Sequence, residues 1–162
     1  MLGILEDRPM RILKEVVPFD EILECYADEH HGWKGYEIGL EYLTSANRRC
    51  QGRWTLVLLS DADIANVMLP SHNHPIEVIP ASGLSVYEAV QRLKQLPKDR
   101  IPDCWERICE IKDRDFSQMH IALEIENGIL KHVDGVHRLL AYVLFEKNQE
   151  VRAYVAGVMP AS

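Results

Sequence analysis

The chain lacks an excess of positive charge, and it lacks any closely spaced pair of cysteines. Lys and Arg number 18 against 25 Asp and Glu, which gives a formal net charge of −7. General binding to nucleic acid depends on clustered Lys and Arg that neutralise phosphates, so we predict no nucleic-acid partner. The four cysteines contain no C-x-x-C motif, and we expect reduced thiols with no disulfide or zinc framework.

Long hydrophobic runs are also missing. No stretch approaches the roughly 18 consecutive apolar residues of a membrane span. Residues 1–9 contain Asp7 and Arg8, where a signal peptide would have an apolar core. We therefore predict a soluble cytoplasmic protein with no membrane partner. The 162 residues are the length of one domain, 1–162, and they suffice for a sizeable core without metal.

The hydrophobic residues that are present alternate between strand-like and helix-like spacing, which predicts the α/β (α+β) class. Strand patterns occupy residues 11–17, 54–59, 76–79, 119–126, 129–133 and 151–158. Helical patterns occupy residues 19–26, 33–50, 60–69, 85–96, 104–112 and 136–145. Asn127-Gly128 is a strong hairpin signal, so residues 119–133 are predicted to form two antiparallel strands.

The end of this hairpin is the stretch around which the chain is organised. Asp134-Gly135 supplies the positive φ of a sharp reversal between the last hairpin strand and a helix. That helix carries His137 and Arg138 in its first turn. Backbone N–H groups at the start of a helix lack partners within the helix and attract anions. We therefore predict a strand–turn–helix site that binds an anionic group.

Histidines beside a carboxylate can move protons near neutral pH. We expect His137 to act as a general acid or base, Asp134 to orient an imidazole and Arg138 to hold an anionic substrate group. The predicted catalytic residues are His137, His132, Asp134 and Glu124. The predicted substrate-binding residues are Arg138, Gly135, Trp105, His72, His74 and His120.

The same residues also have structural interpretations. Asp134 can cap the helix, and Arg138 can pair with a carboxylate from elsewhere in the fold, which would make the turn a structural corner. His72 and His74 can begin a metal site, but no further ligand stands at a recognisable spacing, and we predict no metal and no cofactor. His30, with His31, is interpreted as the end of a helix.

The motif Asp134-Gly135-Val136-His137-Arg138 resembles the signature of the ParB/sulfiredoxin-like superfamily. The resemblance implies a ParB/sulfiredoxin-like domain with a small mixed sheet, in which this turn holds phosphate or nucleotide, as in the free-serine kinases. Sulfiredoxin has a cysteine immediately before its His-Arg pair, where this chain has Val136. Sulfinate reduction by a thiol is therefore not implied.

A second resemblance covers most of the chain. It is to a poorly characterised actinomycete family whose members tend to be encoded in natural-product gene clusters. The segments that carry it are residues 11–16, 18–20, 80–84, 104–106, 115–117, 132–138 and 153–157. This resemblance implies a scaffold and a site. The cluster association of similar proteins favours a role in natural-product biosynthesis, and we expect a small-molecule substrate derived from a polyketide.

Three functions remain open from the sequence. The first is a cofactor-independent acid–base lyase or cyclase that acts by dehydration and conjugate addition on a polyketide-derived or tetramate-like substrate. The second is a nucleotide-dependent small-molecule phosphotransferase, which needs acidic residues to hold Mg²⁺. The third is a small-molecule-binding accessory protein without catalysis. We favour the first, because no Gly-rich phosphate loop and no strong acidic pair accompany the turn.

Overall fold

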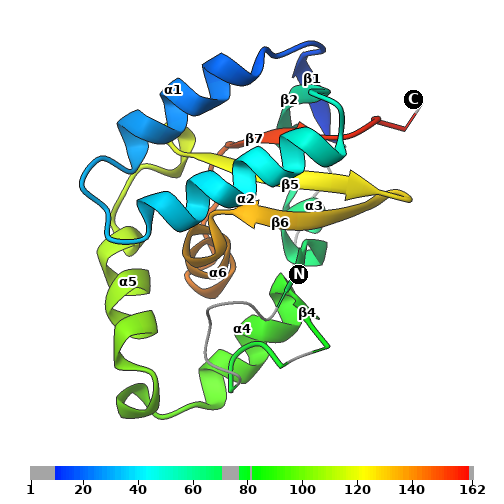
Figure 1. The fold of residues 1–162 in the computed structure, drawn as a ribbon. Coiled ribbons are helices and arrows are strands. Elements are labelled where there is room, and N and C mark those ends of the chain that lie inside the picture. Colours follow the sequence, from blue (N-terminus) through cyan, green and yellow to red (C-terminus); the bar gives the residue numbers. More distant parts are fainter. Residues whose placement is uncertain (1–9, 71–76, 81, 161–162) are drawn as a thin grey trace.

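The computed structural model describes residues 10–70, 77–80 and 82–160. Within them a mixed sheet has the strand order β1-β2-β7-β5-β6-β3-β4 (Figure 1). Its strands are β1 (Arg11–Lys14), β2 (Trp54–Leu59), β3 (Met68–Leu69), β4 (Leu84–Ser85), β5 (His120–Glu126), β6 (Ile129–Asp134) and β7 (Val151–Ala156). The α-helices are α1 (Phe19–Glu29), α2 (Tyr36–Arg49), α3 (Asp61–Asn66), α4 (Val86–Gln95), α5 (Pro102–Lys112) and α6 (Val136–Leu144). The predicted α/β (α+β) class is confirmed.

Helices cover both faces of the sheet, so its central strands are buried on both sides. Alternate residues of β7 show this arrangement, because side chains along a strand point to opposite faces. Val151, Ala153 and Val155 pack in a core with residues of α3 to α6. Tyr154 and Ala156 pack in a second core with residues of α1 and α2, which lie over the sheet in Figure 1.

The hairpin and the helix starts follow the sequence signals. β5 and β6 pair antiparallel across the predicted turn, and β5 also pairs with β7 in parallel. Ser60 caps α3 and Ser85 caps α4, each within a capping box that satisfies N–H groups at the helix start. These local signals place the elements on which the site is built.

Two strand predictions were wrong in extent or type. Residues 77–79 form a turn and a bend, with Val78 and Ile79 buried in the core, so this short apolar run is buried without pairing in the sheet. The strand predicted over 11–17 is shorter in the structure, where β1 ends at Lys14. Its pairing with β2 is irregular between Ile12 and Lys14.

The turn between β6 and α6 has the predicted left-handed backbone. Gly135 has φ 108° and stands at the N-cap of α6. The first backbone bond of the helix runs from the N–H of Leu139 to the carbonyl of Gly135, at 3.0 Å. A Cβ at position 135 would lie 3.3 Å from the side chain of Ile121, so both conformation and space favour glycine.

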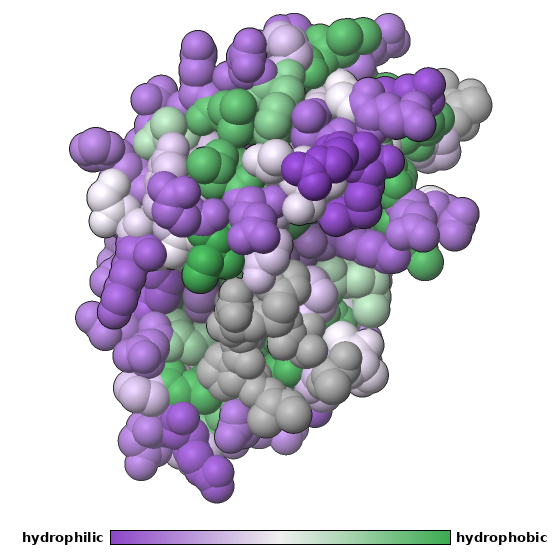
Figure 2. Space-filling view, in the orientation of Figure 1, coloured by the Kyte–Doolittle hydropathy of each residue, from purple (hydrophilic) through white to green (hydrophobic). Residues whose placement is uncertain are grey.

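The outer surface seen in Figure 2 is predominantly hydrophilic, with hydrophobic residues scattered among the polar ones. Exposed hydrophobic side chains include Val16 on the segment after β1 and Ile38 on α2. Among the described residues, none of the helices combines the length and apolarity that crossing a bilayer requires.

Gly135→Ala should lower the free energy of unfolding by about 1–3 kcal/mol, because alanine would be strained at this φ and crowded by Ile121. Gly128→Ala is the matched control, since Gly128 has φ 76° with no neighbouring atom within 4 Å of its added Cβ. Urea denaturation should show a larger loss at position 135. Equal losses of unfolding free energy at positions 135 and 128 would contradict the crowding of an added Cβ by Ile121.

Candidate functional site

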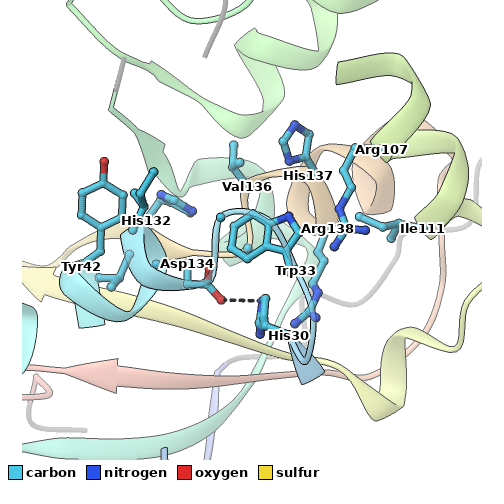
Figure 3. Close-up of a pocket in the computed structure, with 15 residues that line it drawn as sticks. His30, Trp33, Tyr42, Arg107, Ile111, His132, Asp134, Val136, His137 and Arg138 are labelled. Carbon is cyan, nitrogen blue, oxygen red and sulfur yellow. Dashed lines mark ion pairs between the residues drawn. The ribbon is translucent and has the colours of Figure 1, made fainter. Parts of the chain in front are cut away.

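A cavity of about 230 Å³ opens beside the strand–turn–helix (Figure 3). Its lining comes from the end of α1, the following loop, α2, α5, the end of β6 and the start of α6. Chain segments that are far apart in sequence therefore meet at one place. The polar and aromatic side chains of the lining include His30, Trp33, Arg107, His132, Asp134 and His137.

His30 and Asp134 form a buried pair at one side of the cavity. The Nε2 atom of His30 lies 3.3 Å from a carboxylate oxygen of Asp134, the contact that is dashed in Figure 3. The Nδ1 atom of the same ring lies 3.0 Å from the carbonyl oxygen of Tyr26, which can only accept a hydrogen bond. Each ring nitrogen of His30 therefore faces an oxygen of the surrounding protein.

Aromatic rings fix the plane of the His30 imidazole. The ring of Tyr26 stacks on it with centroids 4.2 Å apart, and Trp33 approaches it with centroids 5.4 Å apart. The Tyr26 hydroxyl donates to the carbonyl of Tyr36 at the start of α2, at 2.7 Å. The end of α1 is therefore held against α2 as well as against Asp134.

Arg138 makes a second buried contact at the same place. Its guanidinium is 4% exposed and lies 3.3 Å from a carboxylate oxygen of Glu29. The same nitrogen donates to the carbonyl oxygen of His120 at 2.7 Å. The other oxygen of Glu29 accepts from the backbone N–H of His120 at 2.9 Å and lies 3.2 Å from its Nδ1. We call the set Glu29, His30, His120, Asp134 and Arg138 the buried network.

The buried network shifts the pKa of both its carboxyl groups. Burial alone would raise the pKa of Asp134, but the hydrogen bond from His30 and the nearby charges of His30, His132 and Arg138 outweigh burial and lower it. Burial also opposes ionisation of Glu29, and its bond to His120 and the charge of Arg138 lower that pKa. Both carboxylates are therefore stabilised in the charged form.

A second, much smaller cavity of about 10 Å³ also borders the buried network. Its lining includes Cys25, Glu29, His120 and Tyr154. Burial, followed by the charge of Glu29, raises the pKa of the Cys25 thiol to about 12. The ring of Tyr154 stacks on His120 with centroids 5.3 Å apart.

The structure brings together most of the predicted turn residues. His132, Asp134, Gly135, His137 and Arg138 all line the larger cavity. Asp134 contacts the imidazole of His30, whereas the expectation concerned a histidine two or three residues away around the turn. Asp134 is not the N-cap of α6, because Gly135 occupies that position. Arg138 was expected to hold a substrate anion, whereas its guanidinium is occupied by Glu29 and a backbone carbonyl.

Other predicted residues lie elsewhere. Glu124 is outside the cavity, where it accepts two bonds from Arg49, at 3.0 and 3.1 Å. Trp105 packs against the core at α5 and lines neither cavity, and Lys98 lies over its ring. His120 lines the smaller cavity. His72 and His74 lie outside the described residues.

Sequence reasoning missed several residues that line the cavity, among them His30, Trp33 and Arg107. His30 was interpreted as a helix end, and it is the C-cap of α1, but it also contacts Asp134. Trp33 and Arg107 were not among the predicted residues. The aromatic residues around His30, Tyr26 and Trp33, were the one local signal, because an imidazole flanked by aromatic residues is suited to a buried position.

Arg138→Ala should lower the free energy of unfolding by about 3 kcal/mol, because it leaves Glu29 without its buried cation. Arg49→Ala is the matched control. The side chain of Arg49 is 57% exposed in its pair with Glu124, so its loss should cost less than about 1 kcal/mol. Chemical denaturation of both variants gives the comparison. A loss at position 138 no larger than that at position 49 would contradict the buried pair.

The lowered pKa of Asp134 predicts a loss of stability in acid. The pKa of Asp134 in the folded protein lies below its ordinary value of 3.8. The ionised carboxylate therefore stabilises the fold fully above about pH 5, and this contribution is lost as the pH falls through and below 4. Denaturant midpoints measured between pH 7 and 3 should decline less steeply for Asp134→Asn. The same decline in both proteins would exclude Asp134 as a source of the acid sensitivity.

Comparisons with known proteins bear on the identity of the chain. No curated protein and no solved structure matches it. The profile of a family of unknown function, DUF6309, matches residues 10–162. This match spans nearly the full sequence, and the chain therefore belongs to the DUF6309 family.

Proposed function

We propose that this protein is a cofactor-independent acid–base enzyme of the cytoplasm that acts on a small molecule. The observation that carries the proposal is the convergence of His30, His132, His137 and Asp134 on one cavity. Imidazoles exchange protons near neutral pH, and a cavity positions a substrate against them. The resemblance of the turn to the ParB/sulfiredoxin-like superfamily, proposed here as the fold family, supports a ligand at this place.

The histidines have different tasks in this proposal. Both ring nitrogens of His30 are engaged with Tyr26 and Asp134, so His30 maintains the wall of the cavity. His137, in the first turn of α6, acts as the base, and His132, near the end of β6, acts as the acid. Negative charge that develops on the substrate is stabilised by the start of α6 and the positive charge of Arg138 behind it.

The proposed reaction is dehydration followed by conjugate addition. His137 takes a proton from the carbon beside a carbonyl group, which leaves an enolate. His132 gives a proton to the hydroxyl group one carbon further on, and that group leaves as water as the double bond forms. A hydroxyl or amino group of the substrate then adds to the far carbon of this double bond and closes a ring. His132, which has lost its proton, takes the proton of the attacking group, and His137 returns its proton to the carbon beside the carbonyl, so both histidines regain their starting states.

The size and lining of the cavity support a compact, partly apolar substrate. Its volume of about 230 Å³ is below the range of roughly 300–1,000 Å³ that holds drug-sized ligands. Trp33, Ile38 and Ile111 contribute apolar surface. A small ring of polyketide or tetramate type fits this combination. Phosphotransfer is less well supported, because among the described lining residues Asp134 is the one carboxylate and it is paired with His30.

His137→Ala should lower turnover by about a hundredfold to ten-thousandfold, the usual contribution of a positioned acid or base. The experiment does not require the natural substrate to be known beforehand. The encoding gene is deleted in its host, the metabolite that disappears is identified by mass spectrometry, and variants are reintroduced. His31→Ala is the matched control, because His31 is exposed and lies outside the cavity lining.

The expected result is restoration of the metabolite by the wild-type chain and by His31→Ala, with accumulation of a precursor heavier by one water in His137→Ala. Circular dichroism confirms that the variant is folded. Full restoration by His137→Ala would show that the chemistry does not use this residue. No change in any metabolite on deletion would contradict a biosynthetic role.

A further inference from the structure

The smaller cavity contains a group of side chains that the proposed reaction does not use. Cys25 and Glu29 are four residues apart on α1, which places them on one face of the helix. His120, the first residue of β5, faces them across the cavity. One ligand atom from each of the three residues lies within 4.8 Å of the others. A sulfur, a carboxylate oxygen and an imidazole nitrogen therefore meet on two rigid elements.

The spacing of these atoms is close to that of a zinc site. Zinc bonds of 2.0–2.1 Å to nitrogen and oxygen in tetrahedral geometry place the two ligand atoms about 3.3 Å apart. The Nδ1 atom of His120 and Oε1 of Glu29 are 3.2 Å apart. An ion can thus bridge these two atoms with little movement of either side chain, and a shift of at most about 1.3 Å brings in the sulfur of Cys25.

Surrounding contacts orient the ligands. The second oxygen of Glu29 is bound by Arg138, and the His120 ring is stacked on Tyr154. Such outer contacts fix metal ligands in functional sites. The smaller cavity, which these side chains help to line, has a volume of about 10 Å³, close to that of one water-sized sphere, roughly 10–15 Å³. One small ion therefore fits there.

We propose that Cys25, Glu29 and His120 form a binding site for a divalent zinc-type cation, with the fourth position taken by water. The thiolate and carboxylate supply two negative charges for the two positive charges of the ion. On binding, the bond from sulfur to hydrogen is replaced by a bond from sulfur to metal, and the proton passes to solvent. The mixed sulfur, nitrogen and oxygen set selects zinc over magnesium or calcium, which prefer oxygen ligands.

The site is tested with the full chain after a chelator has removed metal. Calorimetry with zinc chloride should give one equivalent bound, and Cys25→Ala should weaken binding at least about a hundredfold. Cobalt(II) in place of zinc should give a thiolate charge-transfer band that is absent in Cys25→Ala. Cys50→Ala is the matched control, because Cys50 also contacts a carboxylate, that of Glu124, at 3.2 Å.

The expected outcome is loss of the band in Cys25→Ala and in His120→Gln, with the band kept in Cys50→Ala. His137→Ala should bind zinc like the wild-type chain, so this result is independent of the proposed enzyme activity. If Cys25→Ala does not fold, the proposal is tested by comparing the cobalt spectra of the wild-type chain and of His120→Gln, in which the band should be lost. Absence of the wild-type band, or its loss in Cys50→Ala instead, would overturn the proposal.

Discussion

The contact between Arg138 and Glu29 is the interaction on which the rest of the site depends. It joins the first turn of α6 to the last residue of α1 across 109 positions of sequence. A guanidinium that is 4% exposed would destabilise the fold without a partner, and here it also binds the backbone carbonyl of His120. Because Glu29 is fixed in this way, the adjacent His30 is brought to Asp134.

The turn between β6 and α6 consequently has two roles. Asp134 and Arg138 hold α1 in place through the buried network. The same two residues line the larger cavity together with His132 and His137. The left-handed backbone of Gly135 makes the sharp reversal between strand and helix that brings these residues to one place. The packing that holds Asp134 and Arg138 therefore also supports the wall that carries the two imidazoles.

Local signals in the sequence predicted the elements because each depends on nearby residues. The Asp134-Gly135 turn, the hairpin and the helix over 136–144 follow from spacing and turn chemistry, and all are present. The same signals identified His137 and His132, since both lie on the turn or next to it. The class of the fold was predictable for the same reason.

Long-range partners were not predictable in this way. Glu29 and His120 are 91 positions apart, and no local pattern links them. Glu124 was expected near the turn because it shares a strand face with His120, but four residues along β5 take it to Arg49 on α2. The face of β5 that carries His120 and Glu124 is covered by α1 and α2, where Ala122 is buried. Burial by another element cannot be read from the strand itself.

The most direct test of the buried network is the coupling energy between Glu29 and Arg138. A double-mutant cycle with Glu29→Gln and Arg138→Met, followed by urea denaturation, isolates the contact from the effect of either change alone. We predict a coupling of about 1–3 kcal/mol, because both side chains of the pair are largely removed from solvent. Additive losses, with coupling close to zero, would show that the two residues do not hold α1 against α6.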